Sequence, residues 1–125
     1  MLRCYLRPGS SEDKHSTLWL SGPFTSRTAA VAREAIAAAL STGPWLILDV
    51  DSLTRLDRVG LGVLVGARNR MQALDPGGCI HLVSAADSPA TRAVITSGLR
   101  YVLPIAASHH IKCQPPQPFR PRRSI

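Results

Sequence analysis

Residues 45–50, WLILDV, constrain the fold more than any other stretch, because they are apolar with almost no polar alternation. A strand with one solvated face alternates apolar and polar residues, so this pattern predicts a strand that is covered on both faces, as in parallel sheets. CIHLV at 79–83 has the same character, and a helical pattern at about 58–74 lies between the two segments. Strand, helix and strand in this order predict a parallel pair joined by a right-handed crossover.

The two ends of the chain predict three further strands. Residues 1–7 alternate, and TLWLS at 17–21 is a short apolar run, so we expect an antiparallel hairpin with a long loop. Gly22-Pro23 is expected to end the second of these strands. YVLPI at 101–105 predicts a short last strand.

Helical periodicity predicts three helices. Thr25 or Ser26 is expected to cap the first, which runs to about Leu40, and Pro89 stands in the first turn of the last one. The middle helix is the one at 58–74. The apolar faces are expected to contain Val31, Ala35, Ile36 and Leu40 in the first helix, and Val63, Leu64, Ala67, Met71 and Leu74 in the middle one.

These segments predict an α/β fold in one domain over residues 1–105. Its sheet is mixed and mostly parallel, begins with a hairpin, and is flanked by about three to four helices. Residues 106–125 include QPPQPFRPRRSI, which is rich in proline and basic side chains. Such a composition buries too little apolar surface to fold, so we expect a disordered tail.

The net charge of +7 is spread in a way that argues against nucleic-acid binding. The tail carries four basic residues and no acid, while the other charges are scattered along the chain. Scattered charges are typical of a solvated surface, so no direct DNA binding is expected. No apolar run approaches the ~20 residues that span a bilayer, and residues 1–9 lack the apolar core of a secretory signal. We expect a cytoplasmic protein with no membrane segment.

Three glycines after a predicted strand, Gly60, Gly62 and Gly66, invite comparison with a phosphate-binding loop. Their spacing is one residue longer than the dinucleotide fingerprint, and no Walker lysine follows. The sequence contains no G-x-S-x-G nucleophile motif, and its three cysteines are far apart. Asp49, Asp51 and Asp57 around the end of a central strand leave a Mg²⁺ site or acid–base chemistry as a weaker alternative to a helix cap and a solvated loop. The sequence therefore predicts no enzyme, no cofactor and no metal site.

The start of the middle helix contains one favourable and one unfavourable charge. Asp57 precedes the helix and is expected to cap it by accepting from the N–H of Val59 or Gly60. Arg58 places a cation in the first turn, against the helix dipole. The face opposite the predicted core face contains Arg58, Gly62, Val65, Asn69 and Gln72, with Leu61 at its margin. Exposed apolar residues beside a glycine favour a protein-binding face.

The order and spacing of several short patterns give the chain a family resemblance. WLILDV is followed by a loop, DRVGL at a helix start, a Gly-Gly turn, CIHLV, a helix and finally GLRYVL. This order resembles the STAS domain of bacterial anti-sigma-factor antagonists, clearest over 45–105. The resemblance implies a mixed sheet with an initial hairpin. It also implies binding of an anti-sigma factor, often a serine kinase of the histidine-kinase-like ATPase class, and thereby release of a sigma factor.

The chain departs from the family pattern at the regulatory site. Asp57, Gly60 and Leu61 match the motif, in which the kinase phosphorylates the first serine after the aspartate. Arg58 stands at that phosphoacceptor position and Val59 at the next serine position, so neither accepts phosphate. A phosphate would add about −1.5 to −2 charges, whereas an arginine holds +1.

The resemblance therefore implies a protein-interaction module without the usual switch. The candidate partner-binding residues are Thr25, Asp57, Arg58, Val59, Gly60, Leu61, Gly62, Val65 and Asn69. Thr25 stands where the family has an acidic residue after the second strand. Ser52, Thr54 or Ser88 are candidate substitute phosphoacceptors. The chain is expected to be a monomer or weak homodimer. The alternative is a diverged module that senses a nucleotide or small anion, or that binds another signalling partner.

Overall fold

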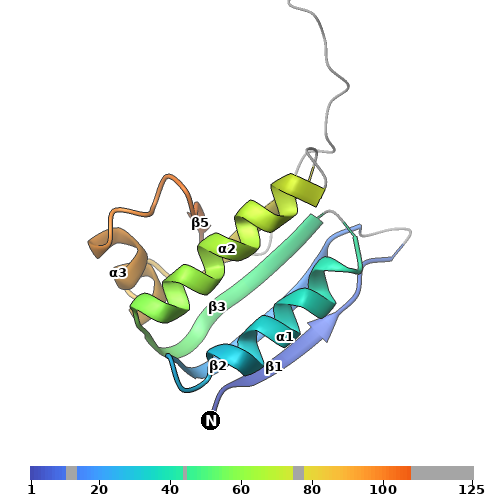
Figure 1. The fold of residues 1–125 in the computed structure, drawn as a ribbon. Helices are drawn as coiled ribbons and strands as arrows, with labels where there is room; N and C mark the ends of the chain where they lie inside the picture. The colour runs from blue at the N-terminus through green and yellow to red at the C-terminus, as the bar shows by residue number, and fades with distance from the viewer. Residues whose placement is uncertain (11–13, 44, 75–77, 108–125) are drawn as a thin grey trace, which may run out of the picture.

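The computed structural model describes residues 1–10, 14–43, 45–74 and 78–107. Within these ranges the chain forms a five-stranded sheet and three helices (Figure 1). In chain order the elements are β1 (Arg3–Arg7), β2 (Ser16–Phe24), α1 (Ala29–Leu40), β3 (Trp45–Leu56), α2 (Arg58–Leu74), β4 (Cys79–Val83), α3 (Pro89–Thr96) and β5 (Ile105–Ala106).

The sheet topology confirms the predicted α/β fold. The strands follow the order β1-β2-β3-β4-β5, with β1 antiparallel to β2 and every later pair parallel. A helix lies in each connection between parallel strands, as such connections require. Helices α1 and α2 lie side by side across one face of the sheet (Figure 1).

A leucine-rich face of the sheet forms the centre of the core. The register aligns Leu6, Leu18, Leu48 and Leu82 across the first four strands, and the last three of these are almost completely buried. Each such buried side chain contributes about 1.5–3 kcal/mol relative to an exposed one. Both α1 and α2 pack their buried residues onto the same cluster.

Strands β2 and β3 continue beyond the points where the sequence predicted their ends. Gly22-Pro23 does not break β2, and residues 51–56, predicted to form a loop, belong to β3. The register shifts at Gly22/Pro23, where Gly22 has φ +93° and Pro23 lacks an N–H to donate. The extension pairs Phe24 with Leu56 and buries both side chains, which explains why the pairing continues.

The predicted helices need three corrections, two to their buried faces and one to the start of α1. Val31 is 45% exposed, because the small side chains of Ala29, Ala32 and Ala39 turn inward with Ile36 instead. Leu74 is 69% exposed, since it lies in the last turn of α2, beyond Met71, the last buried residue of that helix. Helix α1 begins at Ala29, and neither Thr25 nor Ser26 caps it; residue 28 takes the cap position without a side-chain cap bond.

The C-terminal end of the domain also differs from the prediction. The last strand is only Ile105–Ala106, and turns occupy most of the segment predicted as strand before it. Ala106 pairs with Val83, so the sheet runs one residue past the predicted boundary at 105. The predicted disordered tail lies outside the described residues from 108 onward.

Candidate functional site

The start of α2 is capped by Asp57, as predicted. The Gly60 N–H donates to Asp57 Oδ1 at 2.9 Å, and the Leu61 N–H donates to the Asp57 carbonyl at 2.9 Å. The Gly60 bond satisfies a donor that a helix otherwise leaves without an intrahelical partner, and the Leu61 bond is the first bond within the helix itself. The hydrogen bond from Gly60 is the main cause that holds the pKa of the Asp57 carboxyl below its ordinary value of 3.8. Asp57 is therefore an anion at neutral pH.

Asp57 also joins the start of α2 to the turn that follows β2. Its Oδ2 accepts from the Ser26 N–H at 3.2 Å, and its own N–H donates to the Phe24 carbonyl at 3.2 Å. The Ser26 bond and the charge of nearby Arg55 lower the Asp57 pKa further. The site is thus built from two segments that lie more than thirty residues apart in the sequence.

Gly60 is a packing residue rather than an exposed contact. A Cβ at this position would lie 2.7 Å from Leu56 Cδ1 and 2.8 Å from the Phe24 carbonyl oxygen. Such distances are well inside van der Waals contact, so only glycine lets the first turn of α2 approach the end of β2 this closely. Gly60, one of the predicted partner-binding residues, is buried and shapes the first turn of α2, while its contact with a partner stays a prediction.

The structure also changes which apolar residues of α2 are accessible. Leu61, predicted as a contact at the margin of the outer face, is only 8% exposed and belongs to the core. Val65 is half-buried against that core. By contrast Val59 is 39% exposed, and Arg58 and Gly62 are exposed. The buried arc of α2 is broader than its sequence periodicity indicated, because α2 packs against both the sheet and α1.

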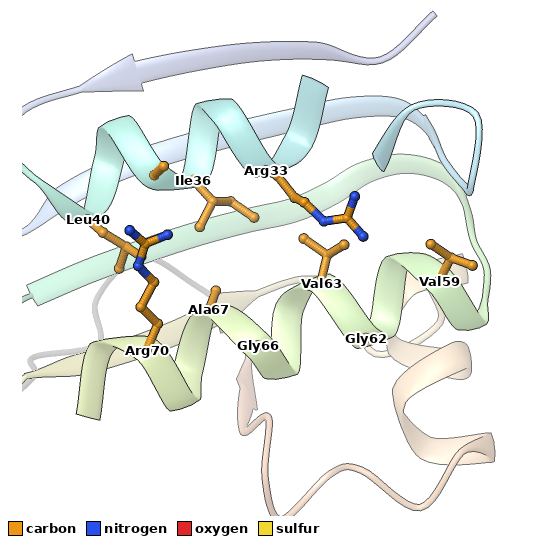
Figure 2. Close-up of a pocket in the computed structure, with 10 residues that line it drawn as sticks. Arg33, Ile36, Leu40, Val59, Gly62, Val63, Gly66, Ala67 and Arg70 are labelled. Carbon is orange, nitrogen blue, oxygen red and sulfur yellow. The ribbon is translucent and has the colours of Figure 1, made fainter. Parts of the chain in front are cut away.

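The exposed residues of α2 that face α1 form a groove, which we call the α1–α2 groove. Its volume is about 330 Å³, and it is lined by Arg33, Ile36, Ala37, Leu40, Val59, Gly62, Val63, Gly66, Ala67 and Arg70. Figure 2 shows Arg33 reaching over Val63, between the middle of the groove and Val59, and Arg70 reaching toward Leu40 at the opposite end from Val59. A Cβ at Gly62 or Gly66 would meet nothing within 4 Å.

Sequence reasoning missed the two arginines of this groove. Arg70 follows Gly62 and Gly66 along one helical row, so its place on α2 was readable from the 3.6-residue period. Arg33 was not readable, because its position beside α2 depends on how α1 is rotated on the sheet.

The remaining predicted contacts lie at the edges of this surface. Asn69 is exposed on α2, and its side-chain oxygen accepts from the Arg68 guanidinium at 3.4 Å. Thr25 lies in the turn after β2, where its N–H donates to Thr28 Oγ1 at 2.9 Å and its Oγ1 accepts from the Arg27 N–H. Thr25 is therefore a turn residue close to the Asp57 cap, without the carboxylate that the family resemblance leads one to expect.

The three candidate substitute phosphoacceptors differ in accessibility. Ser52 and Thr54 are exposed, but they lie within β3 and not in a loop. Ser88 is only 6% exposed; its hydroxyl caps α3 by accepting from the Thr91 N–H and is hydrogen-bonded to the Ser84 hydroxyl. Of the three, only Ser52 and Thr54 present a hydroxyl to solvent.

Two other kinds of site are absent from the described parts of the chain. There, no three His, Cys, Asp or Glu side chains come together in a way that would hold a metal ion. No helix in those ranges combines the length and apolar character needed to cross a membrane.

Comparisons with known proteins agree with this architecture. The STAS domain model matches residues 11–110. The fold is similar to an anti-sigma factor antagonist from Mycobacterium paratuberculosis, with a TM-score of 0.74 and 20% identity over 87% of this chain and 88% of that one. It is also similar to SpoIIAA in its unphosphorylated form, with a TM-score of 0.64 and 19% identity over 83% of this chain and 88% of that one.

SpoIIAA of Bacillus in its phosphorylated form gives a TM-score of 0.59, with 21% identity over 83% of this chain and 91% of that one. No curated protein matches the sequence significantly. At these identities the structural similarities establish the fold. Because the family model covers most of the sequence and the topology agrees with it, the chain belongs to the STAS domain family.

Proposed function

We propose that this protein is an anti-sigma-factor antagonist: a non-enzymatic module that binds an anti-sigma factor and thereby releases a sigma factor. The observation that carries the proposal is the capped start of α2, where Asp57 holds the first turn and leaves Arg58 and Val59 exposed. The likeness to proteins described as anti-sigma factor antagonists supports the same role.

We further propose that binding does not respond to the phosphorylation that switches such modules off. SpoIIAA has been solved in both phosphorylated and unphosphorylated forms, so that protein does take up a phosphate. In this chain Arg58 stands at the position that the family resemblance assigns to the phosphoacceptor, and it carries a permanent positive charge. Of the three candidate substitute acceptors, only Ser52 and Thr54 are exposed, so the proposal keeps these two and excludes the buried Ser88.

The alternative of a nucleotide or small-anion sensor at the start of α2 has less support. Backbone N–H groups at a helix N-terminus attract anions when they are free. Here the Gly60 N–H already donates to the Asp57 carboxylate, whose negative charge would also repel an anion.

The test is to titrate the purified full chain against each anti-sigma factor encoded in the same genome, with and without Mg²⁺-ATP. We expect one of them to bind, to release its sigma factor, and to remain bound in the presence of ATP. Arg58→Ser should make binding sensitive to ATP if that partner is a kinase. Binding to none of the anti-sigma factors would overturn the proposal. Loss of binding on adding ATP would overturn the proposal that binding does not respond to phosphorylation. Mass spectrometry would then identify the modified residue.

Two variants locate the surface. Arg58→Glu and Val59→Asp should each weaken binding roughly tenfold, because they place a negative charge in the contact. Lys14→Glu, an exposed charge reversal just before β2, is the matched control and should leave affinity unchanged. Equal effects from all three variants would mean that net charge, rather than this surface, sets the affinity.

A further inference from the structure

The α1–α2 groove continues the exposed start of α2 along the whole face that α2 shares with α1. We propose that it binds an acidic amphipathic helix of the protein partner, with Arg33 and Arg70 receiving carboxylates at two points along it. This inference rests on the proposed function, since it assumes that α2 lies in a protein interface.

The shape of the groove fits a helix. Its floor is apolar and lies between two parallel helices: Leu40 is half-buried, and Ile36 and Val63 are the buried side chains beneath it (Figure 2). An amphipathic helix that lays its apolar residues into such a groove is a common mode of peptide recognition. From Val59 to Arg70 the groove follows eleven residue steps of α2, or ~16 Å at 1.5 Å per residue, which matches about three helical turns.

The open backbone of α2 allows a close approach. Gly62 and Gly66 lie one turn apart on the groove side, and neither has an atom within 4 Å of the place where a Cβ would be. A helix axis can therefore lie nearer to α2 here than side chains normally permit, since interaxial distances depend on the side chains at the contact.

The positive charge of the groove favours a partner helix with acidic residues. The ten lining residues include two exposed arginines and no carboxylate. An arginine guanidinium binds a carboxylate with two parallel hydrogen bonds, which adds orientation to attraction. A partner helix with acidic residues at two matching points and apolar residues between them is complementary to this arrangement.

The same positive charges make a second copy of this chain a poor occupant of the groove. In a symmetric pair of grooves each copy would present Arg33 and Arg70 to the equivalent arginines of the other copy, and each chain carries a net charge of +7. Like charges brought together across an interface are unfavourable.

The test uses a synthetic acidic amphipathic peptide of about 16 residues, long enough to form a helix on binding. A peptide with lysine in place of every glutamate is the comparison. NMR titration of the full chain should shift the amide signals of α1 and α2 around Gly62 and Gly66 with the acidic peptide only. The affinity should fall as ionic strength rises, because salt screens exposed charges.

Three variants make the assignment specific. The double reversal Arg33→Glu/Arg70→Glu should lower the affinity for the acidic peptide roughly tenfold. Gly66→Leu should also lower this affinity, because its side chain fills the groove, and it should not lower the thermal stability. Arg92→Glu, an exposed reversal on α3, should change nothing. Thermal denaturation of each variant confirms that it is folded.

Several outcomes would overturn the proposal: no shifts with the acidic peptide, equal shifts with both peptides, shifts outside the groove, or concentration-dependent dimerisation through the groove. The proposed function is tested separately. If the identified anti-sigma factor binds and responds to Arg58→Glu but not to Arg33→Glu/Arg70→Glu, the antagonist role stands and the groove assignment fails.

Discussion

The Asp57 carboxylate accepts a hydrogen bond from the Ser26 N–H at 3.2 Å, while its other oxygen accepts from the Gly60 N–H. One side chain thus caps α2 and holds the turn before α1, two segments that are distant in the sequence. Both segments border the surface proposed to bind the partner, so the cap supports the geometry of that surface as well as the helix.

Replacing Asp57 with alanine should lower the free energy of unfolding by about 1–2 kcal/mol, because it removes a helix cap and leaves the Ser26 donor without this acceptor. Urea denaturation at neutral pH measures the loss. The control is Asp87→Ala, an exposed position where a change within about 0.5 kcal/mol is expected. Equal losses in the two variants would contradict the capping role.

The Asp57 cap should also depend on pH. Its pKa is lowered in the folded chain, so the stabilisation is complete above the ordinary value of 3.8 and is lost as pH falls through the lower folded value. In urea denaturation, the natural chain should have a higher free energy of unfolding than Asp57→Asn at neutral pH. This difference should shrink below pH 3.8. A difference that stays constant as the pH falls would show that the charge of Asp57 contributes nothing.

Gly60→Ala should destabilise the fold by about 1–3 kcal/mol, because the added methyl would overlap Leu56 and the Phe24 carbonyl. Gly62→Ala is the matched substitution on the same helix, where the methyl meets open space. It should instead stabilise by up to about 1 kcal/mol through better helix propensity. Thermal denaturation of the two variants should shift in opposite directions, and a shift in the same direction would refute the packing argument.

Leu61→Ala and Val59→Ala should separate folding from binding in the first turns of α2. Leu61 is buried, so its truncation should cost about 2–5 kcal/mol of stability. Val59 is 39% exposed, so the same truncation should cost about 0.5 kcal/mol or less and act on partner affinity instead. Denaturation together with binding assays measures both effects. A stability loss at Val59 as large as that at Leu61 would contradict the assigned orientation of the helix.

His81 on β4 should make the fold sensitive to mild acid. Burial, and to a smaller extent the nearby His15, lowers its pKa from the ordinary value of 6.5. Below pH 6.5 the unfolded chain takes up a proton that the folded chain resists, so stability declines as pH falls. His81→Asn should flatten this decline in denaturation experiments between neutral pH and about pH 5. An unchanged slope would assign the acid sensitivity to other groups.

The sequence predicted those parts of the fold that depend on local pattern. The structure confirms three features that follow from neighbouring residues. These are the apolar strand at 45–50, the bounds of α2 and the Asp57 cap. The family resemblance also led to the correct fold. The continuation of β3 was missed, because it depends on Phe24 pairing with Leu56 across a register shift.

The binding surface was harder to predict because it depends on how elements pack. Helical periodicity placed Leu61 at the margin of the outer face, but contact with two other elements buries it. Arg33 lines the groove only because α1 packs beside α2, which no local sequence pattern indicates. Rotation of a helix on a sheet is decided by side chains from several segments, which no single stretch of sequence contains.

The tight fit of Gly60 against Phe24 bears on how relatives of this chain should be interpreted. A chain that had lost every partner would still be more stable with glycine at this position and with the capping aspartate three residues before it. Natural selection for stability alone would then preserve most of the motif at the helix start. Retention of the motif therefore identifies the architecture, whereas the residue directly after the aspartate, arginine in this chain, is the position on which the proposed loss of the switch depends.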